Sequence, residues 1–289
     1  MTKLNTGLID LHVHTTASDG TMTPEEVVFH AAAQGLKAIA ITDHDTVAGI
    51  PEALEAGIRA GIEVVPGVEL SVKYPGEMHI LGYYIDCQNP ILDRGLDLLS
   101  LYRSERNPQM VRKLQNLGCQ ISMEEVTNEA SGGIIGRPHY AAIMVRKGFV
   151  RDFADAFELY LGVGKPAYVE KDKLTPGQGI EMIVAAGGIP VLAHPKYLQL
   201  SDNIGLDNLV QELKQHGLGG IEVFYSENTP DETERYFSLA IDHGLAVTGG
   251  TDFHGSIKPE LKIGKGKGNL EVRYNFLERL KEIKKRVKN

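Results

Sequence analysis

Cysteine is scarce in this chain, and so are long apolar runs. Cys87 and Cys119 stand alone without a Cys-x-x-Cys spacing, so we interpret both as reduced thiols with a structural role. No stretch approaches the roughly 18 to 20 apolar residues that a membrane span needs. The N-terminal residues also lack the charged and then apolar pattern of a signal peptide. The sequence therefore predicts a cytoplasmic protein with no membrane partner.

An excess of positive charge is also missing. Lys and Arg number 30 against 38 Asp and Glu, for a formal net charge of −8. Proteins that coat a long nucleic acid duplex need clustered Lys and Arg, so this composition argues against a duplex DNA partner. A small nucleotide or a short RNA in a local pocket remains compatible with it. The 289 residues, 42% hydrophobic and 24% charged, suit one large soluble α/β domain, with or without an insertion.

The most informative stretch is DLHVHTTASDG, residues 10–20. His12 and His14 lie at the end of a predicted strand over residues 7–13, and residues two apart on a strand share a face. Two imidazoles side by side suit a transition metal, and Asp19 adds an oxygen ligand from the next loop. A single His-x-His pair can also arise by chance, so the interpretation depends on whether further ligand types recur along the chain.

Strands and helices alternate along most of the sequence. A first hairpin is predicted where the strand over residues 62–71 is succeeded by a return strand over residues 77–84. The other predicted strands cover residues 37–42, 188–193, 219–224 and 245–250, and the predicted helices cover residues 23–35, 47–60, 175–186, 203–216, 230–242 and 274–287.

Between residues 90 and 162 the pattern changes to helical spacing without a strand. Leucines recur from Leu92 to Leu117, and shorter helices are predicted near residues 137–146 and 152–161. We interpret this block as a helical insertion that caps the substrate site. The predicted division is residues 1–89 for the first part of an α/β domain, 90–162 for the insertion and 163–289 for the second part.

Metal-ligand residue types recur at or near the ends of the predicted strands. Glu69 stands between apolar neighbours, and a buried carboxylate needs a partner or a metal. We assign Asp43 and Asp45 to helix capping and loop hydrogen bonds, and the His44 between them to metal. The candidate metal ligands are His12, His14, Asp19, His44, Glu69, His79, His194, Asp252 and His254. Nine ligands exceed the needs of one ion and would suit two or three ions that share bridging carboxylates.

Six motifs in order, DLHVHTTASDG, ITDHDT, GVELS, HILGY, VLAHP and TDFH, resemble the PHP (polymerase and histidinol phosphatase) family of metallophosphoesterases over essentially the whole chain. The resemblance implies a distorted (β/α)7 barrel with a helical insertion domain. GRPHYA and GKPAYV resemble the subgroup that hydrolyses 3′,5′-nucleoside bisphosphates, some of whose members also trim very short RNAs from the 5′ end.

The resemblance also implies a division of the ligands and a choice of metal. One ion would take His12, His14, Glu69 and Asp252, a second Glu69, His79 and His194, and a third Asp19, His44 and His254. Manganese is the first expectation, and iron or zinc the alternatives, because mixed imidazole and carboxylate ligands suit these metals better than magnesium. Glu69 and Asp252 are the predicted catalytic residues.

The expected chemistry is attack on phosphorus by a hydroxide held between two cations, which lower the pKa of the parent water. Ser18, Ser71 and Ser226 show no Ser/His/Asp arrangement that would provide a nucleophile instead. Guanidinium groups bind a second phosphate bidentately, and Arg137 is the first candidate for that role. The predicted substrate contacts are Asp19, His44, His79, Arg103, Arg106, Arg137, His139, Lys165 and His254.

Three alternatives stay open at this point. The substrate could be another small phosphate monoester, such as histidinol phosphate. A related metal barrel could instead hydrolyse a C–N bond, as amidohydrolases do. A non-catalytic, metal-binding accessory domain is the third alternative, against which the full set of ligand types argues.

Overall fold

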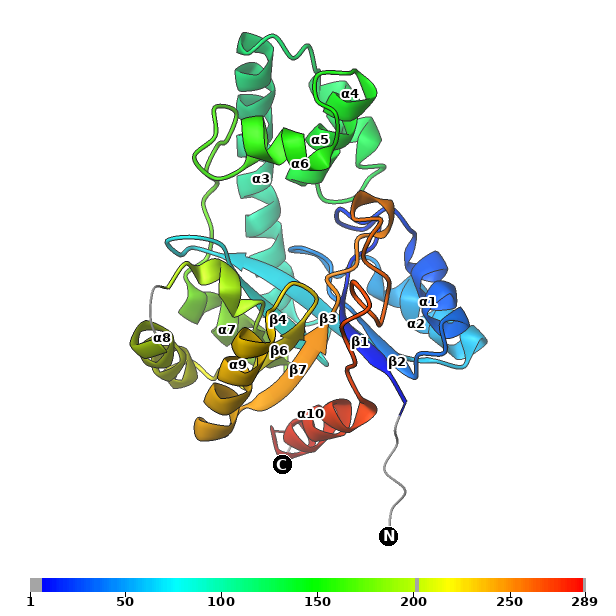
Figure 1. Ribbon diagram of the computed structural model, residues 1–289, viewed down its shortest axis with the longest axis vertical. Coiled ribbons are helices and arrows are strands. Elements are labelled where there is room, and N and C mark those ends of the chain that lie inside the picture. The colour runs from blue at the N-terminus through cyan, green and yellow to red at the C-terminus, as the bar shows by residue number, and fades with distance from the viewer. Residues whose placement is uncertain (1–6, 201–202, 288–289) are drawn as a thin grey trace.

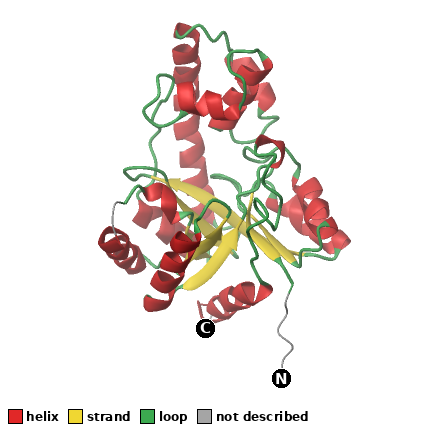
Figure 2. Ribbon diagram, viewed as in Figure 1, coloured by secondary structure: helices red, strands yellow, loops and turns green. Residues whose placement is uncertain are grey.

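A computed structural model describes residues 7–200 and 203–287 of the chain. Seven strands form one sheet in sequence order, and helices surround it (Figures 1 and 2). The strands are β1 (Ile9–Val13), β2 (Ala38–Ile41), β3 (Glu63–Val72), β4 (Met78–Tyr83), β5 (Ile189–Leu192), β6 (Gly220–Tyr225) and β7 (Ala246–Gly250).

The sheet curls until its two edge strands meet. Val13 at the end of β1 bridges Phe253, just after β7, and the backbone N–H of His14 donates to the carbonyl of Phe253 at 2.9 Å. Neighbouring strands are parallel except for β4, which is antiparallel to both β3 and β5. The predicted α/β barrel and the predicted hairpin are therefore confirmed, in a mixed sheet.

Helices in the barrel part begin where the sequence provides caps. Thr23 accepts from the backbone of Glu26, and the Glu26 carboxylate accepts from the backbone of Thr23, so a capping box opens α1. The helices outside the insertion are α1 (Pro24–Ala33), α2 (Ile50–Ala60), α7 (Pro176–Ala185), α8 (Asn203–Gln215), α9 (Pro230–Asp242) and α10 (Tyr274–Val287), with short 3₁₀ turns η2 (Pro195–Leu198) and η3 (Gly255–Ile257).

Apolar packing covers the barrel on its sides and at one end. Val27 and Ile50 from α1 and α2 pack with Ile39 of β2, and Leu277 and Leu280 of α10 pack with Leu11 of β1. Figure 1 shows α10 at the opposite end of the barrel from the helices of the middle block. The α10 end is thus filled with apolar side chains, which leaves the other end for polar residues.

The middle block contains α3 (Pro90–Asn116), α4 (Met123–Glu129), α5 (Arg137–Arg146), α6 (Phe153–Ala156) and the π-helical turn η1 (Phe157–Leu161). Its helices share an apolar cluster of their own that includes Met110, Leu114 and Tyr140. The first turns of α3, with Leu92 and Leu99, pack into the barrel cluster. The block is helical as expected, and α3 anchors it to the barrel. None of the described helices is long and apolar enough to cross a membrane.

Candidate metal centre and substrate pocket

The nine predicted ligands lie at one end of the barrel because of how the strands run. Parallel strands present their carboxyl ends at a common edge. β4 runs the other way, so His79 near its start reaches the same edge, where it pairs with Ser71 of β3. Glu69 lies two residues before Ser71 and faces the same side of the strand. A hairpin thus contributes two ligands to a site otherwise built from β1 and from loops after strands.

Glu69 is fully buried at the centre of the cluster, with five imidazoles around its two oxygens. Around Oε1 lie Nδ1 of His79 at 2.8 Å, Nε2 of His194 at 3.0 Å and Nε2 of His12 at 3.3 Å. Around Oε2 lie Nδ1 of His44 at 2.9 Å and Nε2 of His14 at 3.3 Å. Because each oxygen faces a different set of nitrogens, Glu69 has the geometry of a bridging carboxylate.

Two further carboxylates complete the cluster. Oδ1 of Asp252 lies 3.2 Å from Nε2 of His14 and 3.5 Å from Nε2 of His12. Oδ1 of Asp19 lies 3.3 Å from Nε2 of His254, and its Oδ2 lies 3.9 Å from Nε2 of His44. The arrangement brings all nine predicted ligands into one continuous cluster.

The cluster contains four groups of residues, and within each group the donor atoms lie within 4.8 Å of one another. They are His14, Asp19, His44 and His254; His12, Glu69 and His194; His12, His14 and Asp252; and His44, Glu69 and His79. The groups overlap with the three ligand sets expected from the sequence, but His12, His14 and His44 each take part in two of them. The donor set fits divalent metal ions, which mixed imidazole and carboxylate ligands bind.

Buried polar atoms without hydrogen bonds also favour divalent metal ions at this cluster. Among the described residues, eight buried side-chain nitrogen or oxygen atoms have no hydrogen-bond partner, and seven of these belong to predicted ligands. They are Nε2 of His12, both ring nitrogens of His14, Oδ1 of Asp19, Nδ1 of His44, Oε2 of Glu69 and Nδ1 of His194. Buried polar groups are normally paired, so a concentration of unpaired donors in one place favours a metal site.

Neighbouring positive charge stabilises the ionised carboxylates of the cluster. Burial by itself raises the pKa of Glu69, but the imidazoles of His79, His44 and His12 outweigh it and hold that pKa well below its usual range. Burial likewise lowers the pKa of His14, but the carboxylates of Asp252 and Glu69 raise it to about 10. Both shifts show carboxylates that are stabilised by a neighbouring cation, a role that a metal ion fills.

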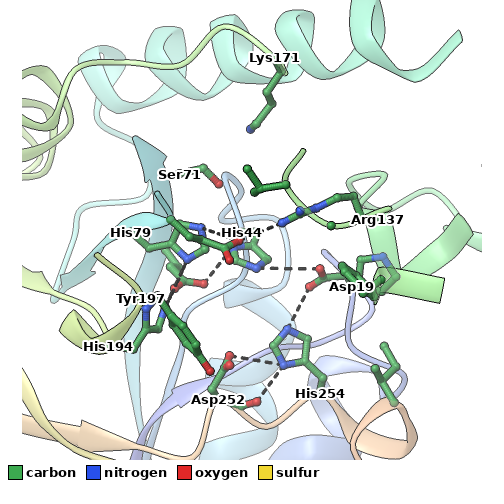
Figure 3. A pocket seen from close by; sticks show the side chains of 18 of the residues that line it. Asp19, His44, Ser71, His79, Arg137, Lys171, His194, Tyr197, Asp252 and His254 are labelled. Atoms are coloured by element: carbon green, nitrogen blue, oxygen red, sulfur yellow. Dashed lines mark hydrogen bonds and ion pairs between the residues drawn. The ribbon is translucent and has the colours of Figure 1, made fainter. Parts of the chain in front are cut away.

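A pocket with a volume of about 390 Å³ opens over the cluster. Its floor carries Asp19, His44, Glu69, His79, His194, Asp252 and His254, and its walls include residues of α3, α5 and the segment after η1. Figure 3 shows Arg137 and Lys171 on the side of the pocket away from Asp252 and His254. A substrate in this pocket would therefore touch the metal donors at one end and cations at the other.

Asp45 holds two cations of the pocket wall beside β3. Its Oδ2 accepts from Nε and Nη2 of Arg103, at 3.1 and 2.5 Å, and from Nζ of Lys171 at 2.8 Å. Its Oδ1 accepts from the backbone N–H of Ser71 at 2.9 Å. The sequence predicts helix capping and loop hydrogen bonds for Asp45. Gly49 is the N-cap residue of α2, so the capping role is wrong, but the carboxylate does accept a backbone hydrogen bond and also holds two cations of the pocket wall. Asp43 does make loop hydrogen bonds, which it accepts from Thr15 and Ser18.

The other two arginines of the wall differ in their partners. Arg137 donates to Oε1 of Glu77 at 2.9 Å and lies over the rings of Phe157 and Tyr168. Arg106 is buried, and among the described residues it donates only to neutral oxygens, the side chain of Asn107 and the backbone carbonyl of Ile135. Burial and the nearby Arg103 lower the pKa of Arg106 to about 10, as expected for a cation without a counter-ion.

Two predicted substrate contacts lie outside the pocket wall. Nδ1 of His139 accepts from the backbone N–H of Gly136 at 2.9 Å, so this ring turns back to cap its own helix. Lys165 is exposed in the turn after η1, whereas Lys171 and Lys173, further along the same segment, do line the pocket. Nothing in the charged run YVEKDK distinguishes those two lysines locally.

Other residues of the site escaped the sequence analysis. Lys258 Nζ and the Tyr225 hydroxyl each lie 3.0 Å from Oδ2 of Asp252, the oxygen that faces away from His12 and His14. Glu222 is fully buried in β6 and contacts His12. Glu222 shares with Glu69 the pattern of an acid inside an apolar strand, so the sequence carries a signal for it.

Comparison with known proteins identifies the family. The PHP domain model matches residues 10–287, so this chain belongs to the PHP domain family, and the resemblance of its motifs is confirmed. A 5′-3′ exoribonuclease Rnm of Escherichia coli is 36% identical over 250 residues, which cover 86% of this chain and 85% of the relative. A 3′,5′-nucleoside bisphosphate phosphatase of Chromobacterium violaceum is 36% identical over 248 residues, which cover 85% of this chain and 87% of the relative.

A solved structure agrees with the fold. A Chromobacterium violaceum protein described as an amidohydrolase, with bound sulfate and no metal, superposes with a TM-score of 0.86 at 33% identity. The match covers 95% of this chain and 96% of the other. The likeness extends over the barrel and the helical block together.

Proposed function

We propose that this chain is a metal-dependent phosphoesterase that hydrolyses the 3′-phosphate of nucleoside 3′,5′-bisphosphates and also trims short RNA from the 5′ end. One observation carries the proposal: a single pocket joins a cluster of metal donors to a wall with surplus positive charge. Five cations, Arg103, Arg106, Arg137, Lys171 and Lys173, face two paired carboxylates, Asp45 and Glu77, which leaves three formal positive charges. Such a wall favours a substrate with a second anionic group.

The metal donors would hold ions on two sides of the cluster. Glu69 and Asp252 would hold ions together with His12 and His14, while Asp19, His44 and His254 would hold another at the opposite side of the cluster. Divalent ions at these donors supply Lewis acidity towards phosphoryl oxygens and an activated water. We expect two or three ions, with manganese first and iron or zinc as alternatives.

The chain's own side chains select and orient the substrate. Arg106 offers a buried guanidinium with no carboxylate partner in the described part of the chain, and Arg103 and Lys171 present charge beside it. These groups would bind the phosphate that the metal donors do not hold, and so fix the distance from that phosphate to the ester to be cleaved. Lys258 and Tyr225 would steady the Asp252 carboxylate through its second oxygen.

The names of the relatives agree with this substrate class. A 3′,5′-bisphosphorylated nucleoside and the 5′-phosphorylated end of an RNA share one feature, a phosphoester on a nucleoside that carries a second phosphate. The relatives named a 5′-3′ exoribonuclease and a 3′,5′-nucleoside bisphosphate phosphatase match this chain at the same level of identity. A pocket that binds the second phosphate would accept both substrates without contacting the base.

The test is a metal analysis and then a substrate panel. Protein loaded with Mn²⁺ is offered adenosine 3′,5′-bisphosphate, a 5′-phosphorylated RNA trinucleotide, histidinol phosphate, p-nitrophenyl phosphate and an N-acetyl amino acid. We expect kcat/KM to be highest for the first two. Highest activity on histidinol phosphate would overturn the substrate, and activity only on the amide would assign an amidohydrolase instead. Metal binding without turnover of any substrate would indicate the accessory role.

A further inference from the structure

Glu222 is an acidic residue in the middle of β6, and both of its carboxylate oxygens are occupied by metal-ligand histidines. Oε1 lies 2.9 Å from Nδ1 of His12. Oε2 accepts from the backbone N–H of His194 at 2.8 Å. The residue is fully buried, and it contributes no atom to the donor groups of the cluster. It therefore lies outside the donor cluster and contacts two of its histidines, His12 on β1 and His194 after β5.

The contact with His12 decides which ring nitrogen carries the proton. An ionised carboxylate only accepts, so the neutral ring must donate from Nδ1 and keep a free lone pair on Nε2. Nε2 is the nitrogen that faces Glu69 at 3.3 Å and Asp252 at 3.5 Å, and it has no hydrogen-bond partner. Glu222 thus selects the tautomer of His12 that can bind a metal at the cluster.

The contact with His194 fixes an unusual backbone. His194 has φ 24° and ψ 67°, a left-handed conformation that a residue with a side chain rarely adopts. Such a conformation persists only where the surroundings hold it. The hydrogen bond from its N–H to Glu222 is one such restraint, and the His194 ring places Nε2 3.0 Å from Oε1 of Glu69.

We propose that Glu222 is a positioning residue of the metal centre, which prepares His12 and His194 to share an ion with Glu69. The three donors lie within one group of the cluster. Partners behind a ligand histidine fix its orientation and contribute to metal affinity. The inference rests on the metal centre of the proposed function and adds to it a residue outside the set of nine ligands.

The decisive variant is Glu222→Gln, which keeps the shape but replaces one acceptor oxygen by an amide NH₂ group. A Gln can accept from the backbone of His194 only by turning its NH₂ group towards His12, which moves the His12 proton from Nδ1 to Nε2. We expect Mn²⁺ and Zn²⁺ affinity to fall about 10- to 100-fold, measured by competition with a chelator. We expect ¹⁵N NMR of the Zn²⁺-loaded wild-type protein to show His12 protonated at Nδ1 only, and this tautomer to be lost in Glu222→Gln.

Tyr83→Phe is the matched control. Tyr83 is also fully buried, and its hydroxyl donates to the carbonyl of Leu11, next to His12, without touching an imidazole. This variant should melt earlier but keep the wild-type metal affinity and His12 tautomer. Glu222→Asp is a second test, because it keeps an acceptor-only carboxylate too short to reach both partners, and it should lose part of the affinity.

The outcomes separate this inference from the proposed function. A wild-type protein that binds no metal would overturn the metal centre and, with it, the proposed function. Wild-type protein that binds metal, together with unchanged affinity and tautomer in both Glu222 variants, would overturn the positioning role alone. Equal losses in Tyr83→Phe and Glu222→Gln would show that any polar deletion in the barrel has this effect, and would also overturn it.

Discussion

Arg103 and Arg106 lie one helical turn apart on α3 and line the same pocket, but within residues 7–200 and 203–287 only Arg103 pairs with a carboxylate. Arg103 holds Asp45, whereas Arg106 donates to Asn107 and to a backbone carbonyl. A buried cation without a counter-ion costs free energy in the free protein, and a bound anion would recover it. The arrangement points to Arg106 as the main contact of the second phosphate. The sequence motifs favour Arg137 for this role, but Glu77 already neutralises that residue.

Replacement of Arg106 should therefore be selective for substrates with two phosphates. We expect Arg106→Met to lower kcat/KM for adenosine 3′,5′-bisphosphate by about 10- to 150-fold, the loss of one charge-assisted contact of about 1.5–3 kcal/mol. The rate with p-nitrophenyl phosphate, which has one phosphate, should change little. Arg137→Met is the control, with a smaller loss. Parallel losses on both substrates would show that Arg106 supports the fold or the metal centre.

Glu69 should matter more than any single terminal ligand. Its two oxygens face different imidazoles, whereas His254 contacts the Asp19 and Asp252 side of the cluster. We expect the kcat of Glu69→Gln to lie at least about tenfold below that of His254→Asn, with a lower metal content per chain. Metal analysis and steady-state rates on one substrate make the comparison. Equal metal content and equal rates in the two variants would contradict a bridging role.

Metal binding should stabilise the fold as well as activate it. The cluster concentrates buried donors without hydrogen bonds, and an ion that binds only the folded chain adds about 2.7 kcal/mol when present at 100 times its Kd. We expect chelation to abolish hydrolysis and to lower Tm, and addition of Mn²⁺ to restore both. Full activity after exhaustive chelation, with no metal left by elemental analysis, would exclude the metal centre.

The pocket should bind anions less tightly as pH rises above neutrality. Burial and Arg103 lower the pKa of Lys171 to about 7, against the opposing effect of Asp45. Well below pH 7 the lysine is charged in both the folded and the unfolded chain. As pH rises, the folded state loses this proton first, so the cost of burying the charge disappears and the anion contact weakens.

Adenosine 5′-monophosphate is the probe for this effect, because its phosphate has a pKa near 6 and stays a dianion above pH 7. We expect its affinity to fall between pH 7 and 9 by no more than about tenfold per pH unit, the limit for one linked proton. Calorimetry in two buffers should show proton uptake on binding at pH 8. Lys171→Arg should remove both the uptake and the pH dependence, and their persistence would assign them to another group.

His194→Ala should separate chemistry from stability. The ring faces Glu69, and Nδ1 has no hydrogen-bond partner, so the side chain satisfies little of the core. We expect near-normal circular dichroism, reduced metal content and loss of activity. A variant that melts early and keeps its rate per folded molecule would identify His194 as a core residue instead.

The amino-acid sequence determined the barrel and the identity of the metal-ligand candidates. Apolar strands alternate with capped helices, and six of the seven strands carry ligand-type residues on them or close by in the chain, so local patterns were enough to collect nine ligands. The same patterns missed α4, although Ser122 and Glu125 form a capping box that indicates a helix start. They also left the division of the chain at residues 90 and 162 as a prediction.

Tertiary structure alone decided which charges are already paired. Arg103 and Asp45 are 58 positions apart in the chain, Lys171 and Asp45 are 126 apart, and His12 and Glu222 are 210 apart. No periodicity links such residues, because an ion pair depends on where α3 and the strands meet in space. The sequence could show that arginines, lysines and acids exist, but only their packing reveals that Arg106 lacks a counter-ion and that Glu222 stands behind two ligands.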